Sequence, residues 1–436
     1  MKQWTQNTLL GMLLPFFWII FTYNQNHGYF ASCYELLWQV GLILLSLHAF
    51  LSFLHIPYRY TWIVWISLLV PLGNLPVFIG SFIRLIVACT GCLIVRKIPS
   101  FKFVINITVL LLCLNAFQLI RQNSAACKGA QVRLSDVKQF HTPETSHNIY
   151  WIVCDAYVSR LTLQRYYNYD NVPFYNQLQT LGFNTPDGHT KHYPTLRAIN
   201  TYLQNIIAEN PSTLSSLTLH HMLKQAPLFK VCKERGWILH ILEPRFPFLH
   251  HLENIQPLEP FSTSILKEFV YTCFHHNTWL KNILSSSLNK DLFARHRRIN
   301  EQILRITPKI DSKHFYYIHI DCPHAPFILN ADGSFNDDRN SVVWGENEVS
   351  SSGYAAETYQ KRYVNQVQAL NNKLIAWLQH IVKVDPESTI ILQGDHGTFM
   401  TSQEEEHQAL LFAVRTKQTR ALLRPETILK TILGRE

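Results

Sequence analysis

Apolar residues are concentrated in the first part of this 436-residue chain, where five apolar segments follow one another with short polar breaks. The segments span roughly residues 8–23, 35–54, 61–75, 78–95 and 103–120. Because a helix of about 20 apolar residues crosses a bilayer, the pattern predicts a membrane anchor over residues 1–121. The third and fourth segments are short for this role, and one span over 61–79 is the alternative.

Positive charges indicate how such an anchor is oriented. Lys2, Arg59 and the basic group at 96–102 fall at the amino end and in the second and fourth loops, whereas the first loop, residues 24–34, has no Lys or Arg. Five spans therefore leave the amino end inside and the chain beyond residue 121 outside, while four spans would place that part in the cytoplasm. We expect a multi-pass protein of the inner (cell) membrane with a periplasmic or extracellular domain.

Beyond a polar linker at 122–146, short runs of aromatic and β-branched residues predict buried strands. The runs cover residues 148–154, 315–320 and 389–392, and further strands are expected at 237–242 and 410–414. Apolar residues at helical spacing predict a helix over 354–382. Because strands and helices alternate, residues 147–436 are expected to form an α/β domain with a doubly wound sheet.

Acidic residues and histidines follow directly after three of the predicted strands. Asp155 ends the first run, Asp321 and His324 follow the second, and the third continues into Gly-Asp395-His396-Gly. Ligands of open α/β sheets bind at the carboxyl ends of strands, so we expect these side chains to share one crevice. Taken alone, Asp155 could also cap a helix, and His324, which has a proline on either side, could shape a turn.

The charge balance of the chain indicates which partners it favours. With 39 Lys and Arg against 30 Asp and Glu, the formal net charge is +9. Such a balance favours anionic partners such as lipid headgroups, phosphorylated glycans or the membrane surface. No long basic run is present, and no nucleic-acid partner is expected.

The nine cysteines contain no pair of C-x-x-C motifs, which excludes a zinc ribbon, although an exported domain could carry one or two disulfides.

Four stretches of the chain resemble the alkaline phosphatase superfamily, and within it the sulfatase-like membrane transferases. The stretches are IYWIVCDAY, YPTLRAINTYLQN, HIDCPHAPF and QGDHG, and the resemblance covers roughly residues 147–415. This group includes lipoteichoic acid synthases and lipid A phosphoethanolamine transferases. The resemblance implies a sulfatase-like catalytic domain after the transmembrane helices.

Carried over position by position, the resemblance assigns a role to five residues. Asp155, Asp395 and His396 become metal ligands, Thr195 becomes both the nucleophile and a fourth ligand, and His324 binds the phosphoryl oxygens or assists the leaving group. The chemistry agrees, because a divalent cation lowers the pKa of a coordinated hydroxyl. Two carboxylates and an imidazole suit one zinc or manganese ion. If Thr195 opens a helix, the amino end of that helix adds partial positive charge.

Departures from the family pattern leave alternatives open. The tyrosine stands two residues before Thr195 where three are usual, so Thr190 and Thr201 are rival nucleophiles. The acidic residue that usually follows Asp-His-Gly is replaced by Thr398. Residues 404–406 are three glutamates and are expected to be solvated. A position near the metal is an alternative for His407, which follows them.

The resemblance implies a membrane-anchored, metal-dependent transferase. It would move a phosphoryl headgroup, phosphoethanolamine or phosphoglycerol, from a membrane phospholipid to a cell-envelope glycan or lipid through a phospho-threonine intermediate. The first strand is followed by one aspartate instead of a pair, and the chain has no Cys-x-Pro-x-Arg motif, which favours transfer over ordinary sulfatase activity. A sulfatase- or phosphodiesterase-type hydrolase and a non-catalytic membrane protein of the same fold are the alternatives.

Overall fold

The computed structural model describes mainly residues 147–204, 216–234, 236–242, 313–336 and 355–417, with shorter stretches elsewhere. The predicted anchor at 1–121 lies almost wholly outside these residues, and so does most of the predicted linker at 122–146, although its residues 124–130 are described and form a helix instead of an irregular linker. The chain divides into two compact units, Met1–Ala125 with Phe261–Leu288 and Ala126–Pro260 with Asn289–Glu436, and the described residues belong almost entirely to the second. Among the described residues, no helix combines the length and the apolar character that crossing a bilayer requires.

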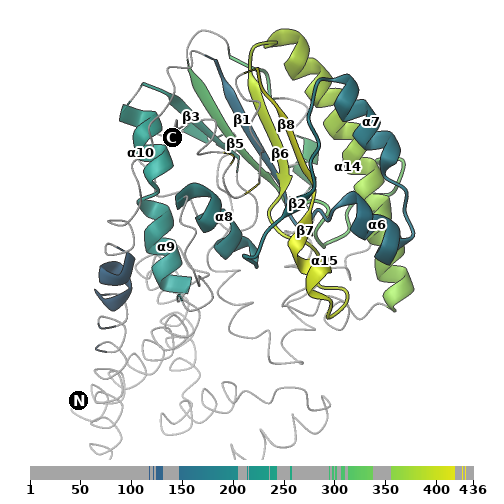
Figure 1. The fold of residues 1–436 in the computed structure, drawn as a ribbon, viewed down its shortest axis with the longest axis horizontal. Coiled ribbons are helices and arrows are strands. Elements are labelled where there is room, and N and C mark those ends of the chain that lie inside the picture. Colours follow the sequence, from purple (N-terminus) through teal and green to yellow (C-terminus); the bar gives the residue numbers. More distant parts are fainter. Residues whose placement is uncertain are drawn as a thin grey trace, which may run out of the picture. The chain divides into compact units, whose positions relative to one another are not determined.

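A six-stranded mixed sheet forms the centre of the second unit, with strand order β4-β3-β5-β1-β6-β8 (Figure 1). The strands are β1 (Ile149–Cys154), β3 (Ile238–Leu242), β4 (Gln256–Pro257), β5 (His314–Ile320), β6 (Thr389–Gly394) and β8 (Phe412–Arg415). Neighbouring strands from β4 to β6 run parallel, and β8 joins β6 antiparallel at the edge. All residues of β1, β5 and β6 are buried, which explains why their sequences are mainly apolar.

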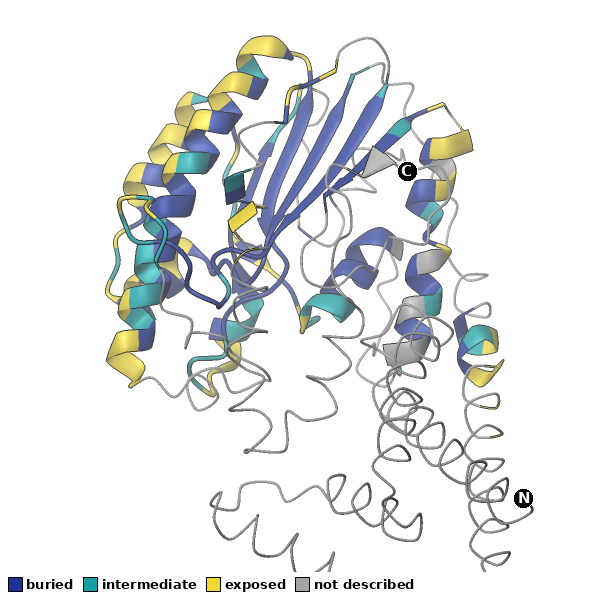
Figure 2. Cartoon of the chain, turned by 180° about the vertical axis from the view of Figure 1, so that it is seen from behind, coloured by how far each residue is buried: buried dark blue, intermediate teal, exposed yellow. Residues whose placement is uncertain are grey.

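Helices cover both faces of the sheet, as a doubly wound α/β fold requires (Figures 1 and 2). One face packs against α6 (Arg160–Tyr167), α7 (Val172–Thr180) and α14 (Ala356–Val384). The other packs against α8 (Thr195–Gln204), α9 (Ser216–Lys224) and α10 (Pro227–Glu234). Figure 2 shows the buried strands between helices whose outer sides are exposed.

The long helix α14 illustrates how a helical spacing of apolar residues produces one face of this core. Its buried stripe includes Tyr359, Tyr363, Val367 and Leu374, which recur about every turn. The helix was predicted over 354–382 and runs from Ala356 to Val384. It ends two residues before Pro386, in keeping with the bias of pre-proline residues against helix.

The alternation of side chains along each strand determines which residues lie on the face of the sheet that α8 covers. Successive side chains of a strand point to opposite faces of the sheet. Val153 of β1, Tyr317 of β5 and Ile391 of β6 belong to the core that includes α8 residues. Counting in steps of two from these positions places Asp155, His319 and Asp395 on the same face of the sheet.

Four of the predicted strands are confirmed as β1, β3, β5 and β6. The run predicted as one strand over 410–414 is instead divided at Leu411 into β7 (Ala409–Leu410) and β8. The reason is that β7 pairs with β2 (Gly188–His189) in a separate two-stranded sheet, whereas β8 pairs with β6. The four described cysteines, Cys127, Cys154, Cys232 and Cys322, are free thiols.

Candidate active site

Two carboxylates, an imidazole and a threonine hydroxyl meet at the carboxyl ends of the central strands. Asp155 follows β1, Asp395 and His396 follow β6, and Thr195 is the first residue of α8. The Nε2 atom of His396 lies 3.1 Å from the Thr195 hydroxyl, 3.4 Å from Oδ2 of Asp395 and 3.7 Å from Oδ1 of Asp155. Four residues predicted for the site from three remote segments therefore lie together.

Asp395 is held rigidly and carries one carboxylate oxygen that faces the cluster. Its side chain is fully buried, and its Oδ1 atom accepts hydrogen bonds from the main-chain N–H groups of Ala156 (2.9 Å) and His396 (2.8 Å). Its Oδ2 atom has no hydrogen-bond donor among the described residues. Burial alone would raise the pKa of Asp395, but nearby His396 and His319 outweigh this effect and hold the pKa below its ordinary value.

The chain turns sharply after Asp155. Ala156 has a φ angle of 56°, in the left-handed region, which costs a residue with a Cβ about 1 kcal/mol. This conformation accompanies the hydrogen bond from its N–H to the Asp395 carboxylate. Local backbone strain thus accompanies the contact between the ends of β1 and β6.

The hydrogen bonds of His396 determine which of its nitrogens faces Thr195. Because a carbonyl oxygen only accepts, Nδ1 of His396 is the protonated nitrogen that donates to the Gly397 carbonyl (2.5 Å). In the neutral ring, Nε2 then carries a lone pair directed at the threonine hydroxyl. The helix α8 begins at Thr195, so its amino end also contributes partial positive charge here.

The rival threonines have main-chain partners of their own. The Thr201 hydroxyl donates to the Arg197 carbonyl one turn earlier in α8 (3.0 Å). The Thr190 hydroxyl accepts from the N–H of His192 (3.2 Å), within a local turn. Thr195 is thus the member of this group whose hydroxyl is placed against His396.

The loop that carries His324 is fixed to α14 by a single buried glutamine. The side-chain oxygen of Gln366 accepts from the N–H groups of Ile328 (2.7 Å) and Leu329 (3.2 Å). Its amide nitrogen donates to three carbonyls of the same loop, those of Pro323, His324 and Pro326. The His324 N–H donates to the Asp155 carbonyl (3.0 Å), which ties the loop to the end of β1.

A buried glutamate organises the segment after Asp-His-Gly, and sequence reasoning missed it. Residues 404–406 were predicted to be solvated, which is wrong for Glu406, because its side chain is fully buried. Its carboxylate accepts hydrogen bonds from the hydroxyls of Tyr167, Thr398 and Thr401 and from the Thr401 N–H. Thr398, which replaces the family's acidic residue, therefore binds an acid supplied from eight positions later. Gly397 passes so close to the Glu406 carbonyl that a Cβ would overlap it.

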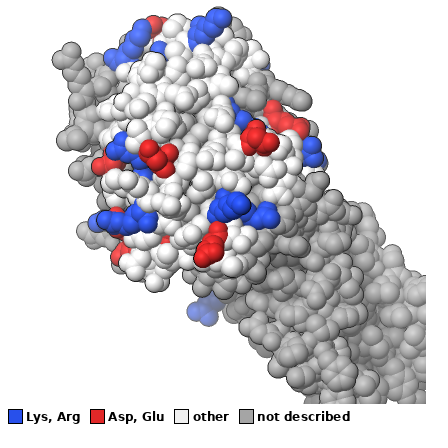
Figure 3. Space-filling model, turned by 90° about the vertical axis from the view of Figure 1, so that its right-hand side faces the viewer, with Lys and Arg blue, Asp and Glu red and all other residues white. Residues whose placement is uncertain are grey.

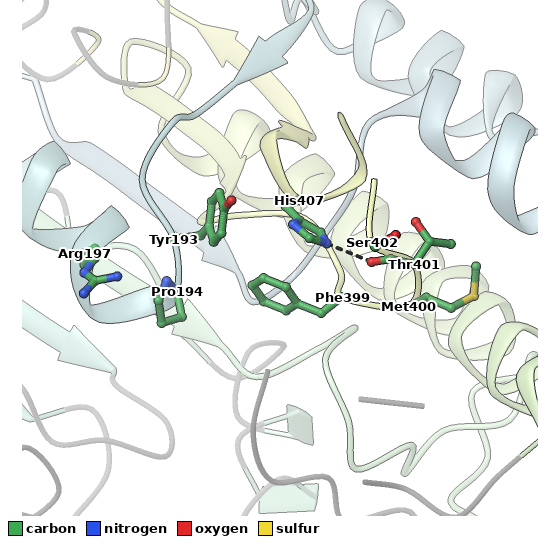
Figure 4. Close-up of a pocket in the computed structure, with 8 residues that line it drawn as sticks. All are labelled: Tyr193, Pro194, Arg197, Phe399, Met400, Thr401, Ser402 and His407. Atoms are coloured by element: carbon green, nitrogen blue, oxygen red, sulfur yellow. Dashed lines mark hydrogen bonds between the residues drawn. The ribbon is translucent and has the colours of Figure 1, made fainter. Parts of the chain in front are cut away.

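A pocket of about 410 Å³ has Pro194, which directly precedes α8, and Arg197 of α8 in its wall (Figure 4). It is lined by Tyr193, Pro194, Arg197, Phe399, Met400, Thr401, Ser402 and His407. The rings of Tyr193, Phe399 and His407 contact one another, with centroid separations of 4.7–5.6 Å. His407 donates from Nε2 to the Thr401 carbonyl (2.9 Å) and lies in the pocket wall.

The cluster has the chemistry of a divalent-cation site. Ligand atoms of Asp155, His319 and Asp395 all lie within 4.8 Å of one another. Two of these atoms, Oδ2 of Asp395 and Nε2 of His319, are buried without a hydrogen-bond partner among the described residues. Buried carboxylate oxygens and imidazole nitrogens that lack a hydrogen-bond partner fit a cation. His319 was absent from the predicted site, and burial lowers its pKa below the ordinary value, which favours the neutral ring that metals bind.

On the face that Figure 3 shows, charged side chains do not gather into a patch of one sign. Basic and acidic side chains are interspersed there, often as neighbours. Pairs such as Arg165–Glu405 and Lys417–Glu387 are exposed, so solvent and salt screen them and each contributes little to stability.

No family model and no curated protein matches the chain. Among solved structures, it resembles the integral membrane lipooligosaccharide phosphoethanolamine transferase A of Neisseria meningitidis, at 9% identity and a TM-score of 0.41, over 98% of this chain and 94% of that one. It also resembles the zinc complex of the C-terminal periplasmic domain of EptC from Escherichia coli, at 12% identity and a TM-score of 0.38, over 67% of this chain and 83% of that one.

A third similar structure is the lipoteichoic acid synthase LtaP of Listeria monocytogenes, at 12% identity and a TM-score of 0.39, over 71% of this chain and 78% of that one. The solved structures that the chain resembles are thus sulfatase-like members of the alkaline phosphatase superfamily, the group that the four sequence stretches resemble. At identities of 9–12% these likenesses concern the fold alone.

Proposed function

We propose that this chain is a membrane-anchored, metal-dependent transferase that moves a phosphoryl headgroup by way of Thr195. The observation that carries the proposal is the Thr195 hydroxyl, 3.1 Å from Nε2 of His396 and beside the carboxylates of Asp155 and Asp395. A threonine hydroxyl is a weak nucleophile at neutral pH, and groups that remove or stabilise its proton have to lie close to it. This cluster supplies them.

Asp155, Thr195, Asp395 and His396 would hold one divalent ion, zinc or manganese. When bound, the ion supplies positive charge that lowers the pKa of the hydroxyl and offsets negative charge as it develops. The main-chain bonds to Asp395 Oδ1 and to His396 Nδ1 hold both side chains in place before any ligand arrives. Such preorganisation is what makes electrostatic stabilisation effective.

The reaction would proceed in two displacements at phosphorus. In the first, the Thr195 oxygen bonds to phosphorus, the bond from phosphorus to the lipid oxygen breaks, and that oxygen takes up the proton that the threonine gives up. In the second, a hydroxyl oxygen of a glycan or lipid acceptor bonds to phosphorus, the bond from phosphorus to the Thr195 oxygen breaks, and that oxygen takes up the proton that the acceptor hydroxyl gives up. His324, held by Gln366 next to the end of β1, is proposed to bind the phosphoryl oxygens or protonate the leaving oxygen.

The pocket that Pro194 and Arg197 line is proposed to receive the headgroup. Its volume of about 410 Å³ falls within the range of small-molecule sites, and its aromatic rings and hydroxyls suit a polar group carried on an apolar tail. A membrane anchor at 1–121 would bring the site to its donor, which is itself in the bilayer. The domain would then lie in the periplasm or outside the cell, with an envelope glycan or lipid as acceptor.

The test uses the full-length protein in vesicles that contain phosphatidylethanolamine or phosphatidylglycerol with a labelled headgroup, with envelope lipids added as acceptors. We expect the label to move to an acceptor, and an acid-quenched sample to carry a phosphoryl headgroup on the peptide that contains Thr195. Thr195→Ala should abolish both signals.

Other outcomes would favour the alternatives. Release of free headgroup without a modified acceptor would show a hydrolase. Full activity of Thr195→Ala, or no label on the wild-type peptide and no product, would contradict the proposed function.

A further inference from the structure

We propose that His319 of β5 is a further metal ligand of this site, through its Nε2 atom. The inference rests on the metal site of the proposed function, but it concerns a residue that none of the four sequence stretches assigns to the metal. It changes the expected donor set from one imidazole to two. Three observations support this role: the position of His319 in the sheet, the surroundings of its two nitrogens and its distance from the two carboxylates.

The register of the sheet places His319 beside the cluster. It pairs with Val153 of β1, two residues before Asp155. Val153 pairs in turn with Gln393 of β6, two residues before Asp395. The level of His319 in the sheet is thus two residues before that of the two carboxylates, and the three residues belong to the same face of the sheet.

The measured separations agree with this placement. One nitrogen of His319 and one oxygen each of Asp155 and Asp395 lie within 4.8 Å of one another, close enough for a single cation to bridge them after small side-chain adjustments. The imidazole is 1% exposed, so bulk water does not compete for this position.

The two nitrogens of His319 have different surroundings. Nδ1 lies 3.1 Å from the Tyr317 hydroxyl. Nε2 is buried and has no hydrogen-bond partner among the described residues. A buried polar atom without a partner is costly and uncommon. With Nδ1–H donating to the tyrosine oxygen, Nε2 presents its lone pair to the carboxylates, which is the arrangement that outer partners impose on metal-bound histidines.

A second imidazole also bears on the choice of metal. Two carboxylates with two imidazoles and a hydroxyl resemble the mixed nitrogen and oxygen sites that bind zinc, whereas manganese prefers sites richer in oxygen. We therefore expect zinc to bind more tightly than manganese. The competing explanation is a core histidine that Tyr317 holds in place and that never touches a metal.

The experiment measures zinc binding directly, with the full-length protein in detergent, zinc chloride as the ligand and a chelating dye as competitor. His319→Gln should raise the dissociation constant for zinc by about 100-fold or more, since loss of an outer-shell partner alone costs 10–100-fold. Tyr317→Phe should raise it by about 10-fold. His314→Gln is the matched control, because His314 is 1% exposed on the same strand and its ring contacts His240. This control should bind zinc as the wild type does.

X-ray absorption at the zinc edge of the wild-type protein keeps the inference testable even if a variant fails to fold. Two imidazole ligands on the zinc of the wild type, and one on the zinc of His319→Gln, are the results that support the proposal. A single imidazole in the wild type, an unchanged dissociation constant in a folded His319→Gln, or no zinc bound by the wild type would each overturn it. If the protein transfers headgroups but its zinc has only one imidazole ligand, this inference is wrong and the proposed function stands. If the zinc has two imidazole ligands but no headgroup is transferred, the proposed reaction is wrong and this inference stands.

Discussion

The hydroxyl of Thr195 and the Nε2 atom of His396 lie 3.1 Å apart although 201 positions separate the two residues in the chain. A second contact between helix α8 and the residues after β6 supports this one. Two turns after Thr195, the Tyr202 hydroxyl donates to the main-chain carbonyl of Asp395 (2.8 Å). The helix therefore meets the residues that follow β6 at two points, which fixes where its first residue lies.

Replacing Thr195 should affect the reaction far more than the fold. We expect Thr195→Ala to lower turnover by about 10⁴-fold or more, as loss of a nucleophile commonly does. Thr195→Ser keeps the hydroxyl and should retain measurable turnover. Thermal unfolding of the alanine variant should shift little, because the residue is half-buried. Turnover and melting temperature are the two measurements.

Thr201→Ala is the matched control for that variant. It removes a hydroxyl of the same helix that is hydrogen-bonded to Arg197. It should keep turnover within about threefold, since a single helix hydrogen bond contributes about 1 kcal/mol to stability and none to the chemistry. Equal losses in both variants would contradict the special role of Thr195.

Gln366 should be necessary for the conformation of the loop that carries His324. Gln366→Leu leaves the N–H groups of Ile328 and Leu329 and three carbonyls without their side-chain partner. We expect a loss of about 3 kcal/mol or more in the free energy of unfolding, at roughly 1–3 kcal/mol for each buried group left without a partner. Turnover should fall as well, because His324 loses its position.

The exposed Gln379 of the same helix provides the comparison. Gln379→Leu should change stability by no more than about 0.5 kcal/mol, as surface substitutions usually do. Denaturant unfolding of both variants tests the prediction, which is wrong if the two lose equal stability.

Glu406 should position the pocket wall through its charge. Glu406→Gln replaces an acceptor-only carboxylate with a group that carries two donors, so the hydroxyls of Thr398 and Thr401 lose charge-assisted bonds of roughly 1.5–3 kcal/mol each. We expect lower melting temperature and weaker substrate binding together. Glu404→Gln, on the exposed side of the same short helix, should change neither, and a shift in Glu404→Gln as large as that in Glu406→Gln would contradict the role of the buried charge.

The charge of the pocket predicts which headgroup it prefers. Among its eight described lining residues, Arg197 carries a full positive charge and none is a carboxylate. An ethanolammonium group would meet that charge, whereas a glycerol group would not. We therefore expect faster transfer from phosphatidylglycerol than from phosphatidylethanolamine, by about fivefold for a repulsion near 1 kcal/mol.

Arg197→Ala should reduce this preference, and the ratio of kcat/KM for the two lipids is the measurement. Lys383→Ala, which removes an exposed cation at the far end of α14, should leave the ratio unchanged. A wild-type preference for the ethanolamine lipid would show that the sign of the prediction is wrong.

The burial of His319 predicts how stability depends on pH when the metal has been removed. Burial lowers its folded-state pKa below the ordinary 6.5, so the unfolded chain takes up a proton first as pH falls. Stability should therefore be fully present above pH 6.5 and decline as pH falls below that value. Asp395, whose pKa lies below the ordinary 3.8, contributes in the same direction only in stronger acid.

Melting temperatures of the chelator-treated protein between pH 5 and 8 test this prediction. His319→Gln should flatten the curve in this range, and His314→Gln should not. An unchanged slope in His319→Gln would assign the pH dependence to other groups.

The main strands and the acidic residues that follow them could be predicted because buried central strands are rich in apolar and aromatic residues. His319 and Glu406 could not, and for different reasons. His319 stands inside such a run, where a histidine resembles a core residue until the strand register shows what lies beside it. Glu406 follows two exposed glutamates, and only the three-dimensional arrangement of the segment after Asp-His-Gly buries the third side chain among hydroxyls.

The two-residue strands β2 and β7 have a consequence for ligand design. β2 precedes the pocket wall that includes Tyr193, and β7 begins two residues after the wall residue His407. Their pairing, with the bond from the Thr190 N–H to the Gln408 carbonyl (2.9 Å), joins both walls at their base. The distance between the two pocket walls is therefore set before a ligand binds. A flat, rigid inhibitor that matches this distance would lose little conformational entropy on binding, whereas a flexible analogue of the lipid would lose much more.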